Sequence, residues 1–387
     1  MKLNTKHGEV EIYAETVEQE AVSQIIEMAN SPLGENSHIR IMPDCHAGAG
    51  CVIGTTMKIT DKVCPNLVGV DIGCGVDLVK TNIDFENNLE ELDEVIRKYI
   101  PFGIETHLVE KKWVFEDLYC WQYLDFDTQN RAKTALGTLG GGNHFIEAYR
   151  DGWLSVHSGS RNIGYKVAEH YQKLAEKRTK EHNAELTKEK IKTIDPAMRE
   201  KWLKENKITV NKELCYLTGK DMEEYLHDVD IMQRFANDNR IEMLKTIIKA
   251  MGGEVLEHIS SIHNYIDTKD MILRKGAISA HQGQVLVIPL NMRDGLLICR
   301  GKGNAEWNYS APHGAGRLCS RTKTKETFTV EEYAEEMKGI FSTCINASTL
   351  EEAPFAYKDY REIMDCIYPT VEILDRLIPI FNFKASE

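Results

Sequence analysis

The segment from about residue 164 to residue 251 is long, charged and helical in pattern, with one interruption near residues 195–196. Two short apolar runs follow at residues 285–289 and 296–299, and a turn signal at residues 293–295 separates them. We expect both runs to form strands. Helices and short strands that do not alternate as regular βαβ units indicate an α+β fold rather than a doubly wound parallel sheet.

Local patterns predict three further helices. Apolar residues at near-helical spacing indicate a helix over residues 15–29. Asn88 and Glu91 have the spacing of a capping box, and so do Thr329 and Glu332. We therefore expect helices to begin directly after Asn88 and after Thr329.

The charge balance limits how this chain can bind nucleic acid. Of its 387 residues, 47 are Lys or Arg and 60 are Asp or Glu, so the formal net charge is −13. This excludes a general nucleic-acid coat, which needs a basic surface to release phosphate counterions. A local basic cleft stays possible, because residues 274–325 contain nine Lys or Arg and two Asp or Glu. Residues 173–207 contain eleven Lys or Arg and seven Asp or Glu, and we interpret this mixed-charge segment as a solvated helical face.

The sequence gives no sign of a membrane or secreted protein. It contains no run of about 18–20 apolar residues, so we expect no membrane span. The first residues lack the apolar core of a signal peptide. The ten cysteines are too sparse for a disulfide scaffold, which predicts reduced thiols and a cytoplasmic location.

Five short segments combine glycine or asparagine with residue types that bind metals or phosphates. They are residues 69–75, 140–147, 156–161, 263–264 and 313–321. A single histidine is most often a surface or hydrogen-bonded core residue, but four of the thirteen histidines lie in these segments. Binding residues concentrate in loops on rigid scaffolds, so the five segments are candidates for one functional site.

The residue types in these segments indicate phosphoryl transfer. Asp, Cys and three His could hold one or two divalent metals, and ligand softness alone favours zinc. Basic side chains for phosphate are Arg161, Arg274, Lys275, Arg317 and Arg321. The glycine run at residues 137–142 is not a P-loop, because no Gly-Lys-Ser/Thr follows it, and it fits a dinucleotide fingerprint poorly. Metals, arginines and glycine loops together are typical of phosphoryl transfer.

Taken in this order, the segments resemble the RtcB family of GTP-dependent RNA ligases. The matching stretches are residues 42–48, 69–75, 140–147, 157–164, 263–265, 274–277 and 313–321, and residues 382–384 also fit. The resemblance implies one large catalytic domain over residues 1–387, with mixed sheets around a central metal and nucleotide cleft. It also implies a mainly helical, charged insertion at about residues 165–250, and manganese in place of zinc.

The resemblance assigns a role to each candidate residue. The ligands of two Mn²⁺ ions would be Asp71, Cys74, His144, His157 and His263, with the Cys74 thiolate bridging. His313 would attack the GTP α-phosphate and carry GMP covalently. Guanylate contacts would come from Asn143, His144, Phe145, Ile146, Glu147, His263, Asn264, Pro289, Leu290, Asn291, Met292, His313, Gly314, Ala315, Gly316 and Lys384. RNA phosphates would be bound by Arg161, Arg317 and Arg321. The turn at residues 289–295 departs from the small-residue form, Pro-Gly-Ser-Met-Gly, that is usual in the family.

The implied reaction joins an RNA 3′-phosphate, or a 2′,3′-cyclic phosphate after hydrolysis, to a 5′-hydroxyl end in RNA repair or tRNA splicing. Two other interpretations use the same residues. One is a two-metal phosphoesterase that acts on RNA ends without a covalent guanylate. The other is a metal-binding or RNA-binding protein without catalysis. We assign no catalytic role to Asp44, His46, His258 or His281, and we expect Asp44 and His46 to brace a loop.

Overall fold

A computed structural model describes residues 1–205, 211–318 and 320–385 of the chain. Its central element is a five-stranded antiparallel sheet with the strand order β16-β6-β7-β5-β8. The strands are β5 (Gly75–Thr81), β6 (Phe145–Tyr149), β7 (Trp153–Ser158), β8 (Val255–Ile262) and β16 (Pro379–Lys384). This sheet carries most of the predicted site residues at or near its strand ends.

Three further sheets contain the other strands of the described residues. A six-stranded sheet has the order β1-β2-β3-β4-β10-β9, a three-stranded sheet the order β12-β13-β15, and β11 pairs with β14. Their bounds are β1 (Lys2–Thr5), β2 (Gly8–Ile12), β3 (Ile39–His46), β4 (Ile53–Lys58), β9 (Asn264–Asp267), β10 (Ile272–Lys275), β11 (Ala277–Ser279), β12 (Val285–Asn291), β13 (Gly295–Gly301), β14 (Ser310–Pro312) and β15 (Val371–Leu377). Among the described strand pairs only β2 and β3 run parallel. Mostly antiparallel sheets beside separate helices confirm the expected α+β class.

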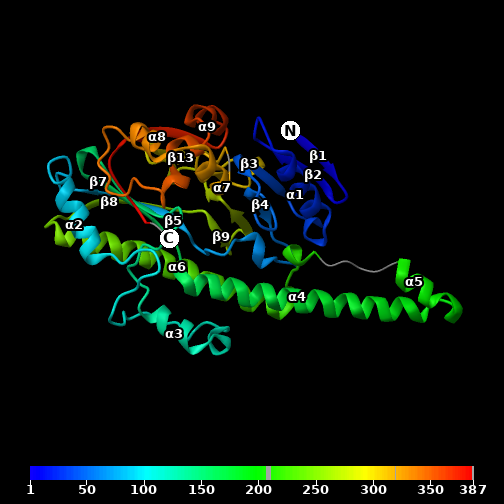
Figure 1. Cartoon of the computed structure of the whole chain (residues 1–387). Helices are drawn as coiled ribbons and strands as arrows, with labels where there is room; N and C mark the ends of the chain where they lie inside the picture. Colours follow the sequence, from blue (N-terminus) through cyan, green and yellow to red (C-terminus); the bar gives the residue numbers. More distant parts are fainter. Residues whose placement is uncertain (206–210, 319, 386–387) are drawn as a thin grey trace.

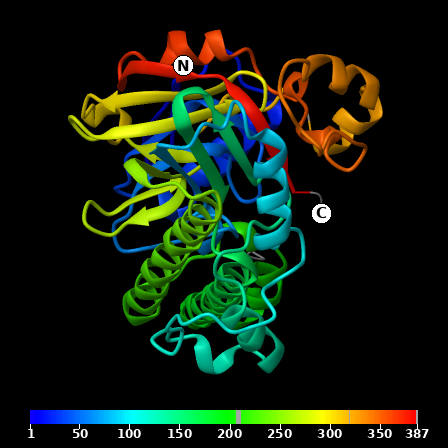
Figure 2. The ribbon, with the colours of Figure 1, turned by 90° about the vertical axis from the view of Figure 1, so that its left-hand side faces the viewer.

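The helices gather below and around the sheets, as Figures 1 and 2 show. Their bounds are α1 (Gln19–Asn30), α2 (Leu89–Tyr99), α3 (Phe126–Lys133), α4 (Arg161–Lys192), α5 (Arg199–Glu205), α6 (Gly219–Ala250), α7 (Arg321–Thr327), α8 (Val330–Glu336) and α9 (Tyr360–Ile367). None of the described helices has both the length and the apolar character needed to cross a bilayer.

The core forms on both faces of the five-stranded sheet. On one face, Ile146 and Val156 pack against Leu92 of α2 and Met243 of α6. On the other face, apolar residues of β5 and β8 pack against β12 and β13 of the three-stranded sheet. The alternation of side chains along each strand supplies both layers. The central sheet is therefore held rigidly between helices and a second sheet.

The helices α4, α5 and α6 cover most of the described residues of the long charged segment, with short 3₁₀ turns and irregular stretches between them. The buried residues of α4 all lie between Ile163 and Ala175, so its second half projects from the body with α5 at its far end (Figure 1). The interruption near Pro196 is present, and Asp195 caps the short turn that follows it. Residues 206–210, which the predicted segment includes, lie outside the described residues.

Most local predictions are confirmed, with two corrections. The predicted strands correspond to β12 and β13, and the side chains of Thr329 and Glu332 form a capping box at the start of α8. The prediction of a capping box at Asn88 was wrong, because the Asn88 side chain donates to the carbonyl of Asp84 while α2 begins without it. The first helix begins at Gln19 rather than at residue 15.

Candidate metal and nucleotide site

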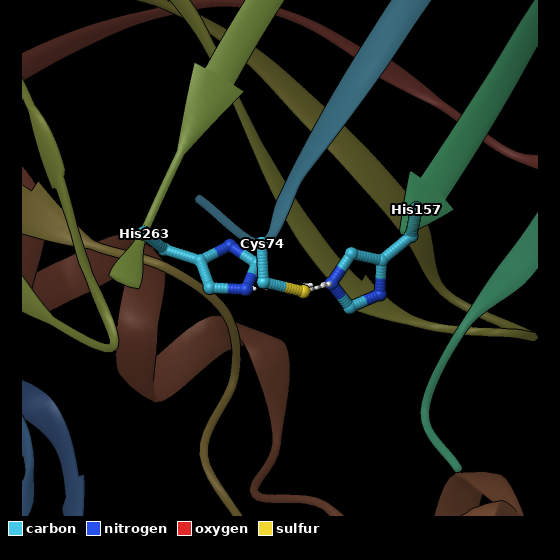
Figure 3. A group of neighbouring side chains, drawn as sticks. All are labelled: Cys74, His157 and His263. Carbon is cyan, nitrogen blue, oxygen red and sulfur yellow. Dashed lines mark hydrogen bonds between the residues drawn. The ribbon is translucent and has the colours of Figure 1, made fainter. Parts of the chain in front are cut away.

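One edge of the central sheet brings distant segments of the chain together. Cys74 directly precedes β5, His157 lies near the end of β7, and His263 directly follows β8. Gly75 pairs with Ser158 on one side and with Ile262 on the other. Because neighbouring antiparallel strands run in opposite directions, the start of β5 lies beside the ends of β7 and β8. Figure 3 shows the thiol of Cys74 between the two imidazoles.

Five potential metal donors form one compact, mostly buried cluster. Cys74 Sγ lies 3.5 Å from His144 Nε2 and 3.3 Å from His157 Nε2. His144 Nε2 lies 3.1 Å from Asp71 Oδ2, and His157 Nε2 lies 3.4 Å from His263 Nε2. The donors form two overlapping groups, one with Asp71 and His144 and one with His157 and His263, and Cys74 belongs to both. Because Cys74 belongs to both groups, its sulfur could ligate a metal ion held by either of them.

Backbone contacts orient two of these histidines. Nδ1 of His144 lies 2.8 Å from the carbonyl oxygen of Leu139, and Nδ1 of His157 lies 3.1 Å from that of Asn143. A carbonyl oxygen only accepts, so Nδ1 of each histidine carries a hydrogen, and a neutral His157 keeps an Nε2 lone pair directed at Cys74. Burial, reinforced by neighbouring histidines, lowers the pKa of His157 and of His263 well below the usual value. Neutral imidazoles with this orientation fit a divalent metal.

Asp71 is held by the start of α4. The backbone N–H of Ser160 donates to Asp71 Oδ1 at 3.0 Å, while Oδ2 faces His144. Burial by itself would raise the pKa of Asp71, but the contact with His144 outweighs it and lowers the pKa to about 2. The carboxylate is therefore ionised at neutral pH, as a metal ligand must be.

Two adjacent residues of α6 hold the loops around the cluster. Arg240, which is fully buried, donates to the carbonyls of Gly73 at 2.9 Å and Ser158 at 3.0 Å. Asn239 accepts from the backbone N–H of Gly137 at 2.7 Å and donates to the carbonyl of Gly159 at 3.1 Å. Gly73 precedes Cys74 and Ser158 follows His157, so these bonds act directly on the donor loops. Nothing in the local sequence around Asn239 and Arg240 indicated this role.

His313 follows β14 and is held by Asp44 of β3. Its Nδ1 lies 2.7 Å from Asp44 Oδ2, and its backbone N–H donates to the same oxygen at 3.2 Å. A carboxylate accepts, so Nδ1 carries the hydrogen and Nε2 keeps its lone pair. The ring centre of His313 lies 5.0 Å from that of His263, which places it beside the donor cluster. Asp44 thus orients His313, a contact between residues 269 positions apart that local patterns could not reveal.

A cavity of about 320 Å³ joins the donor cluster to His313. Its wall includes Asp71, Cys74, Asn143, Phe145, Glu147, His157, His263, Asn264, Pro289, Leu290, Asn291, Met292, His313, Gly314, Ala315, Gly316 and Lys384, all of which the sequence analysis singled out. Ile146 is not among the residues that line the cavity, because alternation along β6 turns its side chain into the core. His144 belongs to the donor cluster without lining the cavity.

Glu147 is the buried acidic group in the wall formed by β6. It accepts from the Tyr149 hydroxyl at 2.7 Å and from Asn382 Nδ2 at 2.8 Å. Burial raises the pKa of Glu147. The two hydrogen bonds and the nearby Lys384 lower it again by a smaller amount, so the pKa is about 7. The group can thus accept or donate at neutral pH, which suits recognition of a polar ring.

The structure separates the three predicted phosphate-binding arginines. Arg317 and Arg321 line the cavity and contact Glu352, a residue that the sequence analysis missed. Arg161 lies behind the cluster, where its guanidinium packs against Gly140 and its Nε donates to Thr138 Oγ1 at 3.1 Å. Gly140 has a φ of +82°, which favours glycine, and a Cβ there would also meet this guanidinium.

The other three histidines named in the sequence analysis have partners of their own. His46 lines the cavity, and its Nδ1 lies 3.1 Å from the carbonyl oxygen of Asp44. His258 Nε2 lies 2.6 Å from Asp77 Oδ1, and His281 Nε2 lies 3.0 Å from Asp270 Oδ2.

Comparison with known proteins gives matches over nearly the whole chain. The matching family is described as tRNA-splicing ligase RtcB, and the match spans residues 24–385. The chain is 32% identical over 428 residues to the RNA-splicing ligase RtcB of Escherichia coli strain K12, with 99% of each chain covered. It is 26% identical over 436 residues to the tRNA-splicing ligase RtcB of Methanococcus maripaludis, covering 92% of this chain and 89% of that protein. A second E. coli protein, RNA-splicing ligase RtcB2, is 27% identical over 413 residues, with 96% and 93% covered.

Proposed function

Because this chain belongs to the RtcB family and is an RNA ligase, we propose that it joins RNA 3′-phosphate ends to 5′-hydroxyl ends, with GTP and two Mn²⁺ ions as cofactors. RNA ends closed as a 2′,3′-cyclic phosphate are first opened by water. The observation that carries this proposal is the position of His313. His313 lines the same cavity as Cys74 and its neighbouring donors, and the contact of its Nδ1 with Asp44 leaves Nε2 free to react. A nucleophile beside a metal cluster is what nucleotidyl transfer needs.

The first step is guanylylation of His313. Asp44 keeps the hydrogen on Nδ1, so Nε2 attacks the α-phosphorus of GTP. A P–N bond forms, the P–O bond to the leaving group breaks, and pyrophosphate departs with the electron pair. Asp71, Cys74, His144, His157 and His263 would hold the two metal ions, which when bound offset negative charge on the triphosphate.

Two further displacements complete the reaction. An oxygen of the RNA 3′-phosphate attacks the phosphorus of the His313-bound GMP, and the P–N bond breaks to leave an RNA end activated by guanylate. The 5′-hydroxyl then attacks the RNA phosphorus, loses its proton and displaces GMP. A 3′–5′ phosphodiester results. Arg317 and Arg321 would bind the RNA phosphate, with Arg161 acting from behind the cluster, where it lies near Asp71.

The remaining assignments complete the proposal. Guanylate contacts come from the cavity residues of β6, the 289–292 turn, the 314–316 loop and Lys384, with Glu147 facing the base. The whole chain would form one catalytic domain, with the charged helices at about residues 165–250 as an insertion. The protein would act in the cytoplasm, in RNA repair or in tRNA splicing.

The experiment that tests the proposal follows a label from GTP into the protein. With GTP labelled at the α-phosphate and Mn²⁺, the purified protein should retain the label through denaturation. Addition of an RNA with a 3′-phosphate and one with a 5′-hydroxyl should give a joined product, and EDTA should abolish both signals. Release of phosphate from RNA ends without GTP, and without a joined product, would instead identify a two-metal phosphoesterase.

Replacing Asp44 by alanine should slow guanylylation by roughly 10²–10⁴-fold, the usual range for a positioned acid–base group. The variant loses the acceptor that holds the hydrogen on Nδ1, so His313 samples the tautomer whose Nε2 cannot attack. The rate of label incorporation at saturating GTP measures the effect. Asp44→Asn keeps an oxygen acceptor and should retain more activity than Asp44→Ala. Equal rates for the wild type and Asp44→Ala would contradict the orienting role.

A further inference from the structure

A buried glutamate, Glu352, lies in the wall of the cavity at the end of the 3₁₀-helix η8 (Leu350–Glu352). Its Oε1 accepts from Arg317 Nη1 at 3.2 Å and contacts Arg321 Nη2 at 3.3 Å. Its Oε2 accepts from Lys384 Nζ at 3.3 Å and from the hydroxyl of Tyr357. Both oxygens thus have two donors each, which uses the full acceptor capacity of a carboxylate.

Three positive side chains share this one carboxylate. The side chain of Glu352 is 1% exposed and that of Lys384 is 5% exposed, so these charges interact with little screening by water. Burial would raise the pKa of Glu352, but Lys384, Arg321 and Arg317 outweigh it and lower the pKa to about 2. Without this anion, the three cations would repel one another in a wall of low polarity.

The surrounding backbone fixes the position of the cluster. The 316–318 loop pairs with residues 356–358, through Leu318 N–H to the carbonyl of Ala356 at 2.8 Å and Lys358 N–H to that of Gly316 at 3.0 Å. The guanidinium of Arg317 stands 5.3 Å from the ring centre of Tyr357. Glu352 therefore links the loop that follows His313 to the last strand, β16.

We propose that Glu352 is a positioning residue that ties the guanylate subsite, through Lys384, to the RNA phosphate subsite, through Arg317 and Arg321. The inference rests on the proposed function, which assigns these cations to the two substrates. A terminal phosphate carries a charge of about −1.5 to −2 at pH 7 and would meet Arg317 and Arg321 in the cavity wall. The RNA phosphate is thereby held in register with the guanylate that it attacks.

A neighbouring residue provides a matched control. The side chain of Glu351 contacts Arg321 and Lys325, whereas Glu352 also contacts Arg317 and Lys384. Glu351→Gln and Glu352→Gln change the net charge equally. They differ in which subsites they disturb, so comparing them separates positioning from a general change in electrostatics.

The test measures the two substrates separately. The GTP dependence of label incorporation gives the KM for GTP. Fluorescence anisotropy without GTP compares an RNA that ends in a 3′-phosphate with the same RNA ending in a 3′-hydroxyl. Glu352→Gln should raise the KM for GTP and weaken binding of the phosphate end, each by about tenfold or more. Glu351→Gln should weaken binding of the phosphate end less and leave the KM for GTP within about threefold.

Two results would overturn the inference. If Glu352→Gln bound the phosphate end more tightly, the carboxylate of Glu352 would oppose phosphate binding and would not position the residues that bind it. An unchanged KM for GTP would remove the link between the subsites. If Glu352→Gln does not fold, Tyr357→Phe decides, because it keeps every charge and removes one donor to Glu352. This variant should raise the KM for GTP and weaken binding of the phosphate end several-fold. Unchanged values would reject the positioning role of Glu352. A wild type without label would instead reject the proposed function itself.

Discussion

Replacing His313 by asparagine is expected to abolish both retention of GMP on the protein and joining of RNA ends. The variant lacks the Nε2 atom that we propose as the nucleophile, and loss of a covalent nucleophile costs on the order of 10⁴-fold or more. His313 lines the cavity and is about one-fifth exposed, and asparagine is smaller, so the change causes no steric clash. Label on the denatured protein and joined RNA on a gel measure the two losses.

Two controls make this result specific to chemistry. Binding of Mn²⁺, followed by electron paramagnetic resonance, should be retained, because Asp71, Cys74 and the three clustered histidines are unchanged. His281→Asn removes a half-exposed histidine that pairs with Asp270 outside the cavity, and it should retain label and joining. Retention of the label by His313→Asn would show that another residue carries GMP.

Replacing Arg240 by methionine is expected to lower the free energy of unfolding by about 3–5 kcal/mol, because Asp77 would remain buried without its main counter-ion. Arg240 and Asp77 are both fully buried, and Arg240 Nε donates to Asp77 Oδ2. Thermal or urea denaturation measures the loss. Mn²⁺ affinity should fall as well, since the carbonyls of Gly73 and Ser158 lose their donor.

The pH dependence of this destabilisation has a definite sign. Burial would raise the pKa of Asp77, but Arg240 and His258 outweigh it and hold the pKa below its usual value. In the wild type, this stabilisation is present above the pKa of the unfolded chain and disappears as pH falls through the folded value. In Arg240→Met the pKa of Asp77 rises, so the carboxyl group takes up a proton at a higher pH than in the wild type. The difference in stability should therefore be largest at neutral pH and shrink towards acid.

Two variants test the interpretation of this pair. Arg234→Met, on the same helix, removes an exposed ion pair with Asp230 and should change stability by less than about 1 kcal/mol. Combining Asp77→Leu with Arg240→Met removes both buried charges and should recover part of the loss. An Arg240→Met protein as stable as the wild type at neutral pH would contradict the buried-charge argument.

Much of the fold could be predicted from local patterns, because the forces involved act within a few residues. Short continuous apolar runs located β12 and β13, and the Thr329–Glu332 spacing located the start of α8. At Asn88 the predicted helix start is confirmed but the capping box was wrong, because the same side chain can instead bond the preceding turn, and spacing does not distinguish the two. Sheet order could not be predicted, because it depends on pairing between strands far apart in the sequence.

The residues of the candidate site also fall into two groups, those that local patterns could predict and those that they could not. Residues with distinctive chemistry in segments that contain glycine or asparagine, such as Cys74, His157, His263 and His313, were predicted and line one cavity. Residues without such a signal were missed, and they are Asn239, Arg240, Glu352 and Tyr357, while Asp44 was expected only to brace a loop. Their importance comes from partners far along the chain, and an acid, an amide, an arginine or a tyrosine is ordinary on any surface.

The sequence by itself determined which donors and cations are available, since softness, charge and hydrogen-bonding capacity belong to each side chain. It also determined that glycine accompanies them where the backbone turns tightly. Only the tertiary structure decided their arrangement: the antiparallel register sets Cys74 between two histidines, and α6 holds the loops behind them. It also turned Ile146 into the core and Arg161 away from Arg317, because side-chain direction follows from strand alternation and packing and not from residue type.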